Sequence, residues 1–383
     1  DKGANENGRK YVLLGDPALR IAFPELNVVT TKVNGAQVGN GQDTLRALME
    51  VTFEGMITDR AGNPVEDFTG TVYPSVFDKE VTQKTLANDG GSVYTFSMRK
   101  NLLYKGKVNV TNGYFSFTFI VPKDIAYRFD TGKISYYATD GTRDATGSYT
   151  NLVVGGASDE NVTDNSGPSI SLYINDLRFR DGGITDPNAR LLAVISDESG
   201  INTIGNGIGH DITAVLDGNT SEPSILNEFY ESDINTFKSG YIWFPFSLLD
   251  AGEHTVTVKV WDILNNSSET SLRFVVLPSG EFVINRTYNF PNPFSDYTDI
   301  IFEHNQQNVD FAIRAEIYSL TGQQVRVIES TATQSGSVST PLRWDGLSQQ
   351  GASMPSGIYV YNLTVRSSNG LFARTSGKLI FQK

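Results

Sequence analysis

Short runs in which apolar and polar residues alternate recur along the chain, and this period of two constrains the fold more than any other feature. Phe115, Phe117 and Phe119 alternate with Ser116 and Thr118, which places the three aromatic rings on one face of a strand. Two later runs repeat the pattern: Val256, Val258, Val260, and Leu272, Phe274, Val276. Gly, Asn and Asp separate the runs, and no long helical period interrupts them. The sequence therefore predicts an all-β protein.

The order of these strands and turns divides the 383 residues into tandem modules. We predict a β-sandwich at 27–155, a polar linker at 156–167, an Ig-like β-sandwich at 168–278 and a small β-sandwich at 279–383. In the last of these, the alternation from Phe311 to Tyr318 and the run at 325–328 flank a Gly-containing turn, which predicts a hairpin. Strands are also expected at 358–365 and 378–381.

Composition and charge exclude several classes of function. The chain has 43 Asp and Glu against 31 Lys and Arg, so its net charge of -12 would repel a nucleic-acid backbone. It contains no Cys, which excludes a disulfide and a thiol nucleophile within these residues. An apolar run of about 18 residues is lacking, so no membrane span is predicted. The first residue is Asp1, not Met, and we expect the sequence to be a piece of a longer protein.

A Gly-rich segment at 202–210 is the least ordinary stretch of the chain. Its glycines do not follow the spacing of a dinucleotide-binding loop, and no helix is expected after them, which argues against phosphate binding. His210 and Asp211 are candidates for metal binding or proton transfer, but a loop held by a hydrogen-bonded histidine is the favoured interpretation. No cofactor is predicted. The alternative is a Ca²⁺ site formed by nearby carboxylates: Asp197, Glu198, Asp211, Asp217.

Five motifs follow one another in the last hundred residues. They are Phe-Pro-Asn-Pro-Phe at 290–294, Tyr-Ser-Leu-Thr-Gly-Gln at 318–323, Trp-Asp-Gly at 344–346, Pro-Ser-Gly-Ile-Tyr-Val-Tyr at 355–361 and Gly-Lys-Leu-Ile-Phe-Gln-Lys at 377–383. In this order they resemble the C-terminal sorting domain of type IX secretion substrates. The resemblance implies a β-sandwich that serves as an address during export across the outer membrane of Bacteroidota.

Upstream segments carry a second resemblance. The Gly-Asp-Pro turn at 15–17 is similar to the segment that closes the caspase-like domain of gingipain-type cysteine peptidases, so 1–26 is expected to be the end of such a domain. Further stretches resemble the C-terminal region of the type IX secretion sortases, which belong to that peptidase family. They lie at 197–203, 207–213, 226–230, 252–255 and 259–262.

The resemblance implies an enzyme of which this chain is the non-catalytic part. Sortases of this family are cysteine endopeptidases and transpeptidases on the cell surface. They remove the C-terminal signals of exported cargo and attach the cargo to anionic lipopolysaccharide. Their catalytic Cys and His would lie upstream, so no catalytic residue is assigned here. The modules are expected to position the enzyme on the extracellular face of the outer membrane.

The same resemblance implies its partners: the outer-membrane β-barrel PorV, the attachment-complex proteins PorQ and PorZ, and the C-terminal domains of cargo. The docking residues expected in the last module are Gly357, Tyr359, Tyr361, Lys378, Leu379, Phe381 and Lys383. For the tyrosines and Phe381, the alternative is that they only pack the core.

Two other classes of function fit parts of the sequence. The chain is also compatible with the tail of an ordinary type IX cargo, such as a surface adhesin or a glycosidase. A carbohydrate-binding module is the other alternative, with Trp243, Trp261 or Trp344 as a stacking platform for sugars.

Overall fold

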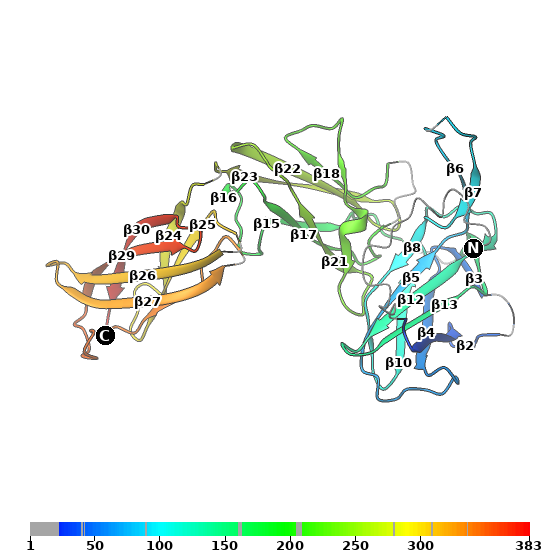
Figure 1. The fold of residues 1–383 in the computed structure, drawn as a ribbon, viewed down its shortest axis with the longest axis horizontal. Coiled ribbons are helices and arrows are strands. Elements are labelled where there is room, and N and C mark those ends of the chain that lie inside the picture. Colours follow the sequence, from blue (N-terminus) through cyan, green and yellow to red (C-terminus); the bar gives the residue numbers. More distant parts are fainter. Residues whose placement is uncertain are drawn as a thin grey trace, which may run out of the picture.

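The computed structural model describes residues 23–39, 41, 43–88, 90–159, 163–203, 209–278, 280–307, 309–334 and 336–383. The segment at 1–26, expected to end a peptidase domain, lies almost wholly outside them. Within the described residues the protein is all-β, as predicted, with one short 3-10 helix, η2 (Asn227–Phe229). No helix in this part is long and apolar enough to cross a membrane. Figure 1 shows the sheets arranged in a row along the long axis.

The first module, 23–159, is built on one large sheet that is antiparallel except for the pairing of β1 with β13. Its strands run in the order β10-β4-β1-β13-β12-β5-β8, with β2 on β1 and β9 on β5, and a smaller sheet β11-β14-β3 packs with it. The bounds are β1 Leu26–Val33, β2 Ala36–Gln37, β3 Asp43–Ala47, β4 Glu50–Thr58, β5 Gly70–Phe77, β8 Leu102–Lys105, β9 Val108–Val110, β10 Tyr114–Ile120, β11 Asp130–Thr131, β12 Lys133–Thr139, β13 Asp144–Tyr149 and β14 Leu152–Ala157.

Aromatic stacking fills the core of the first module, as the alternation in β10 predicts. The rings of Phe115, Phe117 and Phe119 are all buried. Phe53 of β4 lies directly opposite Phe117 in the strand register, with ring centroids 5.3 Å apart. Tyr104 stacks on Phe119 at 4.6 Å. Offset stacking of this kind stabilises more than the buried area alone.

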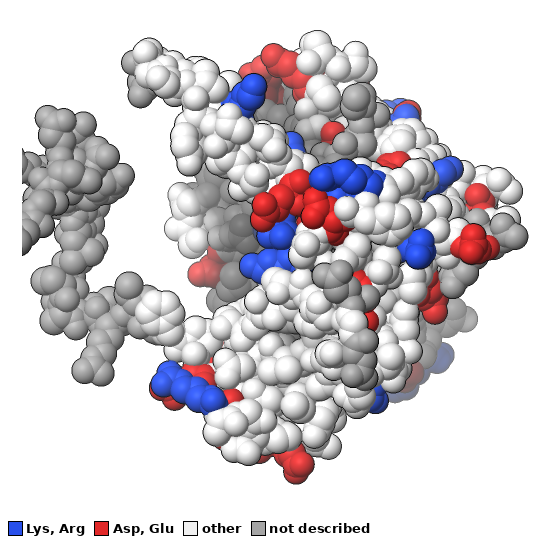
Figure 2. Space-filling view, turned by 90° about the vertical axis from the view of Figure 1, so that its right-hand side faces the viewer, with Lys and Arg blue, Asp and Glu red and all other residues white. Residues whose placement is uncertain are grey.

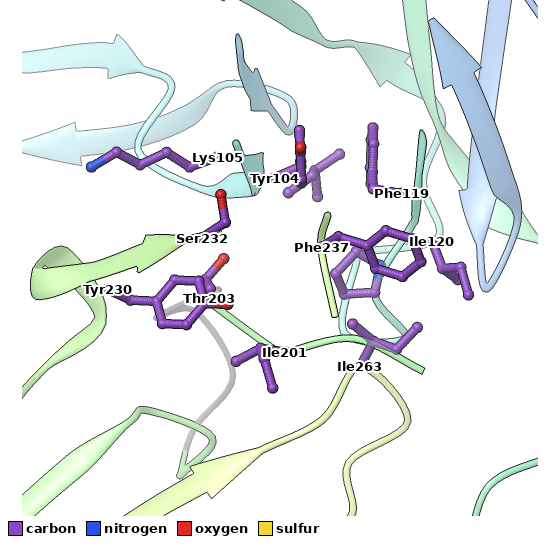
Figure 3. A pocket seen from close by; sticks show the side chains of 12 residues that line it. Tyr104, Lys105, Phe119, Ile120, Ile201, Thr203, Tyr230, Ser232, Phe237 and Ile263 are labelled. Atoms are coloured by element: carbon purple, nitrogen blue, oxygen red, sulfur yellow. The ribbon is translucent and has the colours of Figure 1, made fainter. Parts of the chain in front are cut away.

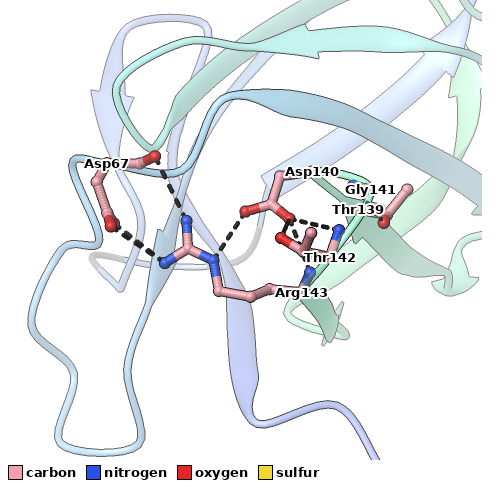
Figure 4. Close-up of polar contacts among 6 residues, drawn as sticks. All are labelled: Asp67, Thr139, Asp140, Gly141, Thr142 and Arg143. Atoms are coloured by element: carbon pink, nitrogen blue, oxygen red, sulfur yellow. Dashed lines mark hydrogen bonds and ion pairs between the residues drawn. The ribbon is translucent and has the colours of Figure 1, made fainter.

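An Asp-centred turn joins β12 to β13 in this module (Figure 4). Asp140 Oδ1 accepts hydrogen bonds from the backbone N–H groups of Thr142 and Arg143, and Gly141 adopts a positive φ of 90°. Arg143 then reaches from Asp140 to Asp67, which lies in the loop before β5. The hydrogen bond from the backbone N–H of Arg143 is the main reason why the pKa of Asp140 lies below its usual range.

The second module, 163–278, is a sandwich of two sheets in the orders β15-β17-β21-β20 and β16-β23-β22-β18-β19. The bounds are β15 Ser169–Ile174, β16 Gly183–Thr185, β17 Arg190–Ser196, β18 Thr213–Leu216, β19 Ser224–Ile225, β20 Tyr230–Ser232, β21 Ser239–Pro245, β22 Gly252–Trp261 and β23 Ser267–Val276. The two predicted runs form β22 and β23, and their alternating apolar side chains are buried between the sheets. Asp262 closes their connection by accepting the N–H groups of Leu264 and Asn266.

The C-terminal module, 280–383, pairs a three-stranded sheet β24-β25-β28 with a four-stranded sheet β27-β26-β29-β30. The bounds are β24 Ile284–Phe290, β25 Thr298–His304, β26 Val309–Ser319, β27 Gln324–Gln334, β28 Leu342–Trp344, β29 Gly357–Ser367 and β30 Phe372–Phe381. The predicted hairpin is confirmed as β26 and β27. The final strand was predicted to begin at Lys378 but begins at Phe372, because its first half pairs with β29 through mostly polar residues.

The modules contact one another at two joints. Between the first and second modules, the N–H of Lys123 donates to the carbonyl of Ile263 at 3.0 Å, and the N–H of Asn235 donates to the carbonyl of Lys107 at 2.8 Å. Between the second and C-terminal modules, Asp176 accepts the N–H of Ser337, and Arg178 donates to the carbonyl of Val338, both at 2.8 Å. These contacts keep the three sandwiches in a row, with the C-terminal module at one end (Figure 1).

Candidate docking site

The Phe-Pro-Asn-Pro-Phe segment at 290–294 lies along the free edge of the last strand, β30. The N–H of Phe294 donates to the carbonyl of Ile380 at 3.0 Å, and the N–H of Gln382 donates back to the carbonyl of Phe294 at 2.8 Å. Asn292 adds two bonds, accepting the N–H of Ile380 at 2.8 Å and donating to the carbonyl of Lys378 at 3.2 Å. We call this segment the clasp. It satisfies backbone groups that an edge strand would otherwise leave open for another chain.

Four aromatic residues from four of the motifs pack together behind the clasp. The ring centroid of Phe294 lies 5.0 Å from that of Phe381 and 5.5 Å from that of Trp344. Trp344 in turn lies 5.1 Å from Tyr359. The indole N–H of Trp344 donates to the carbonyl of Leu347, and the hydroxyl of Tyr359 donates to the carbonyl of Pro355. Motifs that are separated by many residues in the sequence therefore converge at one end of the module.

The glycines of these motifs are required by close packing at two positions. A Cβ on Gly377 would lie 2.2 Å from the hydroxyl oxygen of Tyr361, whose partner is the hydroxyl of Thr287 at 2.8 Å. Gly346 has a φ of 70°, and a Cβ there would lie 2.8 Å from the ring of Phe381. Any larger residue at either position would displace an aromatic ring of the core.

The structure restricts the set of predicted docking residues. Tyr359, Tyr361, Leu379 and Phe381 have side chains with at most 4% exposure, so they stabilise the module and cannot reach a partner directly. This corrects the expectation that they contact the barrel. Burial also raises the pKa of the Tyr361 and Tyr359 hydroxyls. The members of the predicted set that remain at the surface are Gly357, Lys378 and Lys383.

Lys383 and Phe290 are also accessible at this end of the C-terminal module. The N–H of Lys383 donates to the Ser356 hydroxyl at 2.9 Å, and its ammonium donates to the Ser353 hydroxyl at 3.0 Å. Phe290, the first residue of the clasp motif, is 73% exposed. Sequence reasoning missed the roles of Asn292 and Phe290, although an Asn between two prolines is a signal for a side chain that bonds to backbone.

His210 lies at the joint between the first and second modules. Its Nδ1 lies 2.6 Å from a carboxylate oxygen of Asp124, and its ring packs on Trp261 with centroids 4.4 Å apart. The other oxygen of Asp124 accepts the side-chain amide of Asn265 at 2.8 Å. The expectation of a hydrogen-bonded histidine is thus confirmed, whereas the glycines at 205 and 207 lie outside the described residues. Asp124, 86 residues away, carries no sequence signal for this contact.

A small apolar cavity of about 20 Å³ lies at the same joint (Figure 3). Tyr104 and Phe119 of the first module face Ile201, Tyr230 and other residues of the second module across it. The volume is large enough for about one water molecule. This joint is therefore a packed contact and not a substrate cleft.

The carboxylates proposed for Ca²⁺ do not gather as predicted. Glu198 pairs with Lys238 at 3.1 Å, and Asp217 pairs with His254 at 2.7 Å. Asp197 instead lies near two other residues, Asp164 and Asp262, with carboxylate oxygens within 4.8 Å of one another. The hydrogen bonds of Asp262 hold the β22–β23 turn, and those of Asp197 hold the turn at Ser199. We assign a structural role to these carboxylates.

The tryptophans considered as sugar platforms occupy different environments. Trp344 is fully buried and Trp261 packs against His210 and Lys259, so neither presents an open ring. Trp243 lines an open groove of about 740 Å³ on the outer face of β17 and β21, but the guanidinium of Arg190 lies 4.7 Å from its ring centroid.

On the face of the molecule that Figure 2 displays, acidic and basic side chains are interspersed among uncharged residues.

The chain is, by its fold, a tandem β-sandwich protein. No protein-family model matches it, and no curated protein does. Among solved structures it is similar to dimeric latent PorU from Porphyromonas gingivalis, with 31% identity over 96% of this chain and 35% of that chain, at a TM-score of 0.44. The chain thus spans about a third of the length of that PorU structure.

Two further structures are similar at much lower identity. The fibronectin(III)-like modules of Clostridium thermocellum CbhA share 11% identity over 66% of this chain and 95% of that chain, at a TM-score of 0.19. A solved structure from work on a 1.5-MDa bacterial ice-binding adhesin shares 12% identity over 94% of this chain and 98% of the solved chain, at a TM-score of 0.20.

Proposed function

We propose that the chain is the non-catalytic C-terminal part of a type IX secretion sortase of the PorU kind, and that its C-terminal module docks the enzyme on the outer-membrane barrel PorV. The observation that carries this proposal is the convergence of the motifs. The clasp, the Trp-Asp-Gly turn, the Gly-Ile-Tyr strand and the final strand meet at one end of the C-terminal module. The motifs that resemble a sorting domain therefore build one local structure.

The exposed parts of this end supply the chemistry of a docking surface. Phe290 offers an accessible aromatic ring, and Lys378 and Lys383 offer two exposed cationic groups. The buried tyrosines and Phe381 act indirectly, because they fix the strand that carries these groups.

The other two modules act as a spacer in this proposal. They follow one another along the long axis (Figure 1). Backbone–backbone hydrogen bonds hold the first joint, and hydrogen bonds between side chains and backbone hold the second. A catalytic domain attached before residue 23 would be held at the end opposite the C-terminal module. The whole enzyme would lie on the cell surface, where PorQ, PorZ and the C-terminal domains of cargo are its further proposed partners.

The docking role is tested by charge reversal at the surface. Removal of 378–383 would be uninformative, because it deletes the buried Leu379 and Phe381 and unfolds the module. We expect the double variant Lys378→Glu with Lys383→Glu, made in the longer protein, to lose retention on membranes that contain PorV. The double variant Arg366→Glu with Arg374→Glu is the matched control, since it also reverses two exposed charges, at the other end of β29 and β30.

Retention that is equal in the double variant and in the control would contradict the docking role. A cargo identity is separated from a sortase identity by mass spectrometry of the mature surface protein. A sortase that uses this module for docking keeps Lys383, whereas an ordinary cargo loses it when its sorting domain is removed.

A further inference from the structure

A two-stranded hairpin projects from the first module without a covering layer (Figure 1). It consists of β6 (Val81–Lys84) and β7 (Thr95–Met98), which among the described strands pair only with each other. An isolated hairpin of this size is marginally stable in water unless another surface covers one of its faces. Its exposed position therefore requires an explanation.

The register makes the hairpin amphipathic. Val81 lies opposite Met98, and Gln83 lies opposite Phe96, so these four side chains share one face. The N–H of Thr85 donates to the carbonyl of Tyr94 at 2.9 Å, which continues the same face toward the tip. Within the four paired rows the opposite face is polar: Thr82, Lys84, Thr95, Ser97. Beyond these rows, toward the tip, Leu86 and Val93 are also exposed, at 84% and 57%. We call Val81, Tyr94, Phe96 and Met98 the hairpin apolar face.

This apolar face is open to solvent. Phe96 is 38% exposed, Met98 is 42% exposed and Tyr94 is 68% exposed. Large apolar side chains that gather on one side of a projecting element mark a binding surface, whereas single exposed residues do not.

The root of the hairpin is closed by contacts between its two flanks, which keep the strands paired. Asp78 and Lys79 form a buried ion pair at 2.8 Å, directly before β6. Directly after β7, Arg99 pairs with Glu80 at 2.8 Å. The N–H of Asp78 also donates to the carbonyl of Asn101, which ties the two ends together. Strands that are already paired reduce the ordering cost of a contact.

The tip of the hairpin argues against a lipid bilayer as the covering surface. By sequence, the residues between Leu86 and Val93 are Ala-Asn-Asp-Gly-Gly-Ser, a mostly polar stretch that would have to enter the membrane first. Polar side chains and open backbone groups are costly in hydrocarbon. The apolar side chains lie along the stem, which suits a contact made sideways against protein.

The size of the apolar face argues for a tethered partner. At the exposures given above, these four side chains offer on the order of 300 Å² to a partner. An independent partner needs roughly 800 Å² on each side for a stable interface. A domain on the same polypeptide needs less, because its effective concentration is in the millimolar range. The first module, which carries the hairpin, is also the module to which any preceding domain is joined.

We propose that the hairpin apolar face is the contact arm for the peptidase domain that precedes residue 23. This inference rests on the proposed function, which places such a domain there. The hairpin packs its apolar stem on the peptidase domain and fixes that domain relative to the spacer formed by the sandwiches. This contact also stabilises the hairpin, which otherwise consists of two uncovered strands.

Hydrogen–deuterium exchange tests this proposal. The amides of β6 and β7 are compared in the 383-residue chain and in the longer protein that includes the preceding domain. We expect exchange in the longer protein to be at least about ten-fold slower, because the face is covered only there. The double variant Phe96→Ser with Met98→Ser should remove this slowing. The control Thr82→Ala with Ser97→Ala changes the polar face of the same strands and should leave it intact.

Equal exchange rates in the two proteins would overturn the proposal. So would slower exchange in the 383-residue chain on vesicles of phosphatidylethanolamine and phosphatidylglycerol, which would indicate a membrane contact, or on raising its concentration, which would indicate self-association. Thiol-dependent peptide cleavage by the longer protein is measured in parallel. Cleavage with an unprotected hairpin rejects only the contact arm, whereas the absence of a thiol-dependent activity rejects the proposed function.

Discussion

The clasped end of the C-terminal module and the hairpin of the first module solve the problem of exposed strands in opposite ways. At the clasped end, the edge of β30 is bonded by a segment of the same module, and the aromatic rings behind it are buried. In the hairpin, two strands stand alone and leave Phe96 and Met98 in solvent. The comparison shows that large apolar side chains stabilise the fold at the clasped end, whereas in the hairpin they are available for binding.

The largest expected difference between the two regions is in stability. Phe381→Ala should lower the free energy of unfolding of the C-terminal module by about 3–5 kcal/mol, because it empties a site among Phe294 and Trp344. Phe96→Ala should change the stability of the 383-residue chain by less than about 0.5 kcal/mol. Urea unfolding followed by tryptophan fluorescence measures the first effect through Trp344. Comparable losses in both variants would remove the distinction between the regions.

A buried histidine makes the C-terminal module sensitive to acid. His304 is fully buried among Phe282, Phe302 and Phe311, and burial lowers its pKa to about 4. The unfolded chain takes up the proton near pH 6.5, so stability should fall as the pH drops from about 6.5 to about 4. The loss should reach on the order of 3 kcal/mol. His304→Leu should unfold with a weaker pH dependence over this range, and an unchanged dependence would contradict the assignment.

Two glycines of the final motifs provide a sharper comparison within one region. Gly377→Ala should destabilise the module by about 1–3 kcal/mol, because the new Cβ would collide with the hydroxyl of Tyr361. Gly357→Ala should have little effect on stability, since the nearest atom to its new Cβ lies 3.9 Å away. Thermal unfolding of both variants decides this. If Gly357→Ala nevertheless weakens retention on membranes, the exposed start of β29 takes part in docking.

The smallest expected effect concerns the clasp. Asn292→Ala removes the bonds to Ile380 and Lys378 and should cost about 1 kcal/mol. It should also open the edge of β30, so amide exchange at Ile380 should become faster while the rest of the sheet is unaffected. Unchanged exchange at Ile380 would show that the backbone bonds of Phe294 alone hold the edge.

The sequence predicted those parts of the fold that depend on local pattern. The period of two in Phe115 to Phe119 and in Val256 to Val260 identified strands and their buried faces correctly, because alternation directly reflects which face is in the core. The hairpin β6–β7 was missed, although Tyr94, Phe96 and Met98 alternate with Thr95 and Ser97 in the same way. The run is short, and the pattern does not show that this strand pairs with β6, whose one apolar residue is Val81. Register between strands is not visible in a single strand.

The candidate site was predicted only in part, again because the sequence does not show which residues meet in space. The motifs indicated the correct region, but Tyr359, Tyr361, Leu379 and Phe381 turned out to be core residues, because a recognisable motif marks packing as often as contact. The pairing of His210 with Asp124 could not be predicted, since it joins two modules. Likewise, the sequence grouped Asp197 with its neighbours in the chain, whereas folding places it near Asp164 and Asp262.

The clasp has a consequence for how this polypeptide matures. Asn292 and Ile380 are 88 positions apart, yet both must be present before the edge of the four-stranded sheet has its hydrogen bonds. A chain that emerges from its amino end therefore leaves the module unfinished until β30 has emerged. Synthesis or translocation as far as β30 is thus a condition for closure, and a product that stops before Ile380 leaves the edge of this sheet without its hydrogen bonds and open to proteases.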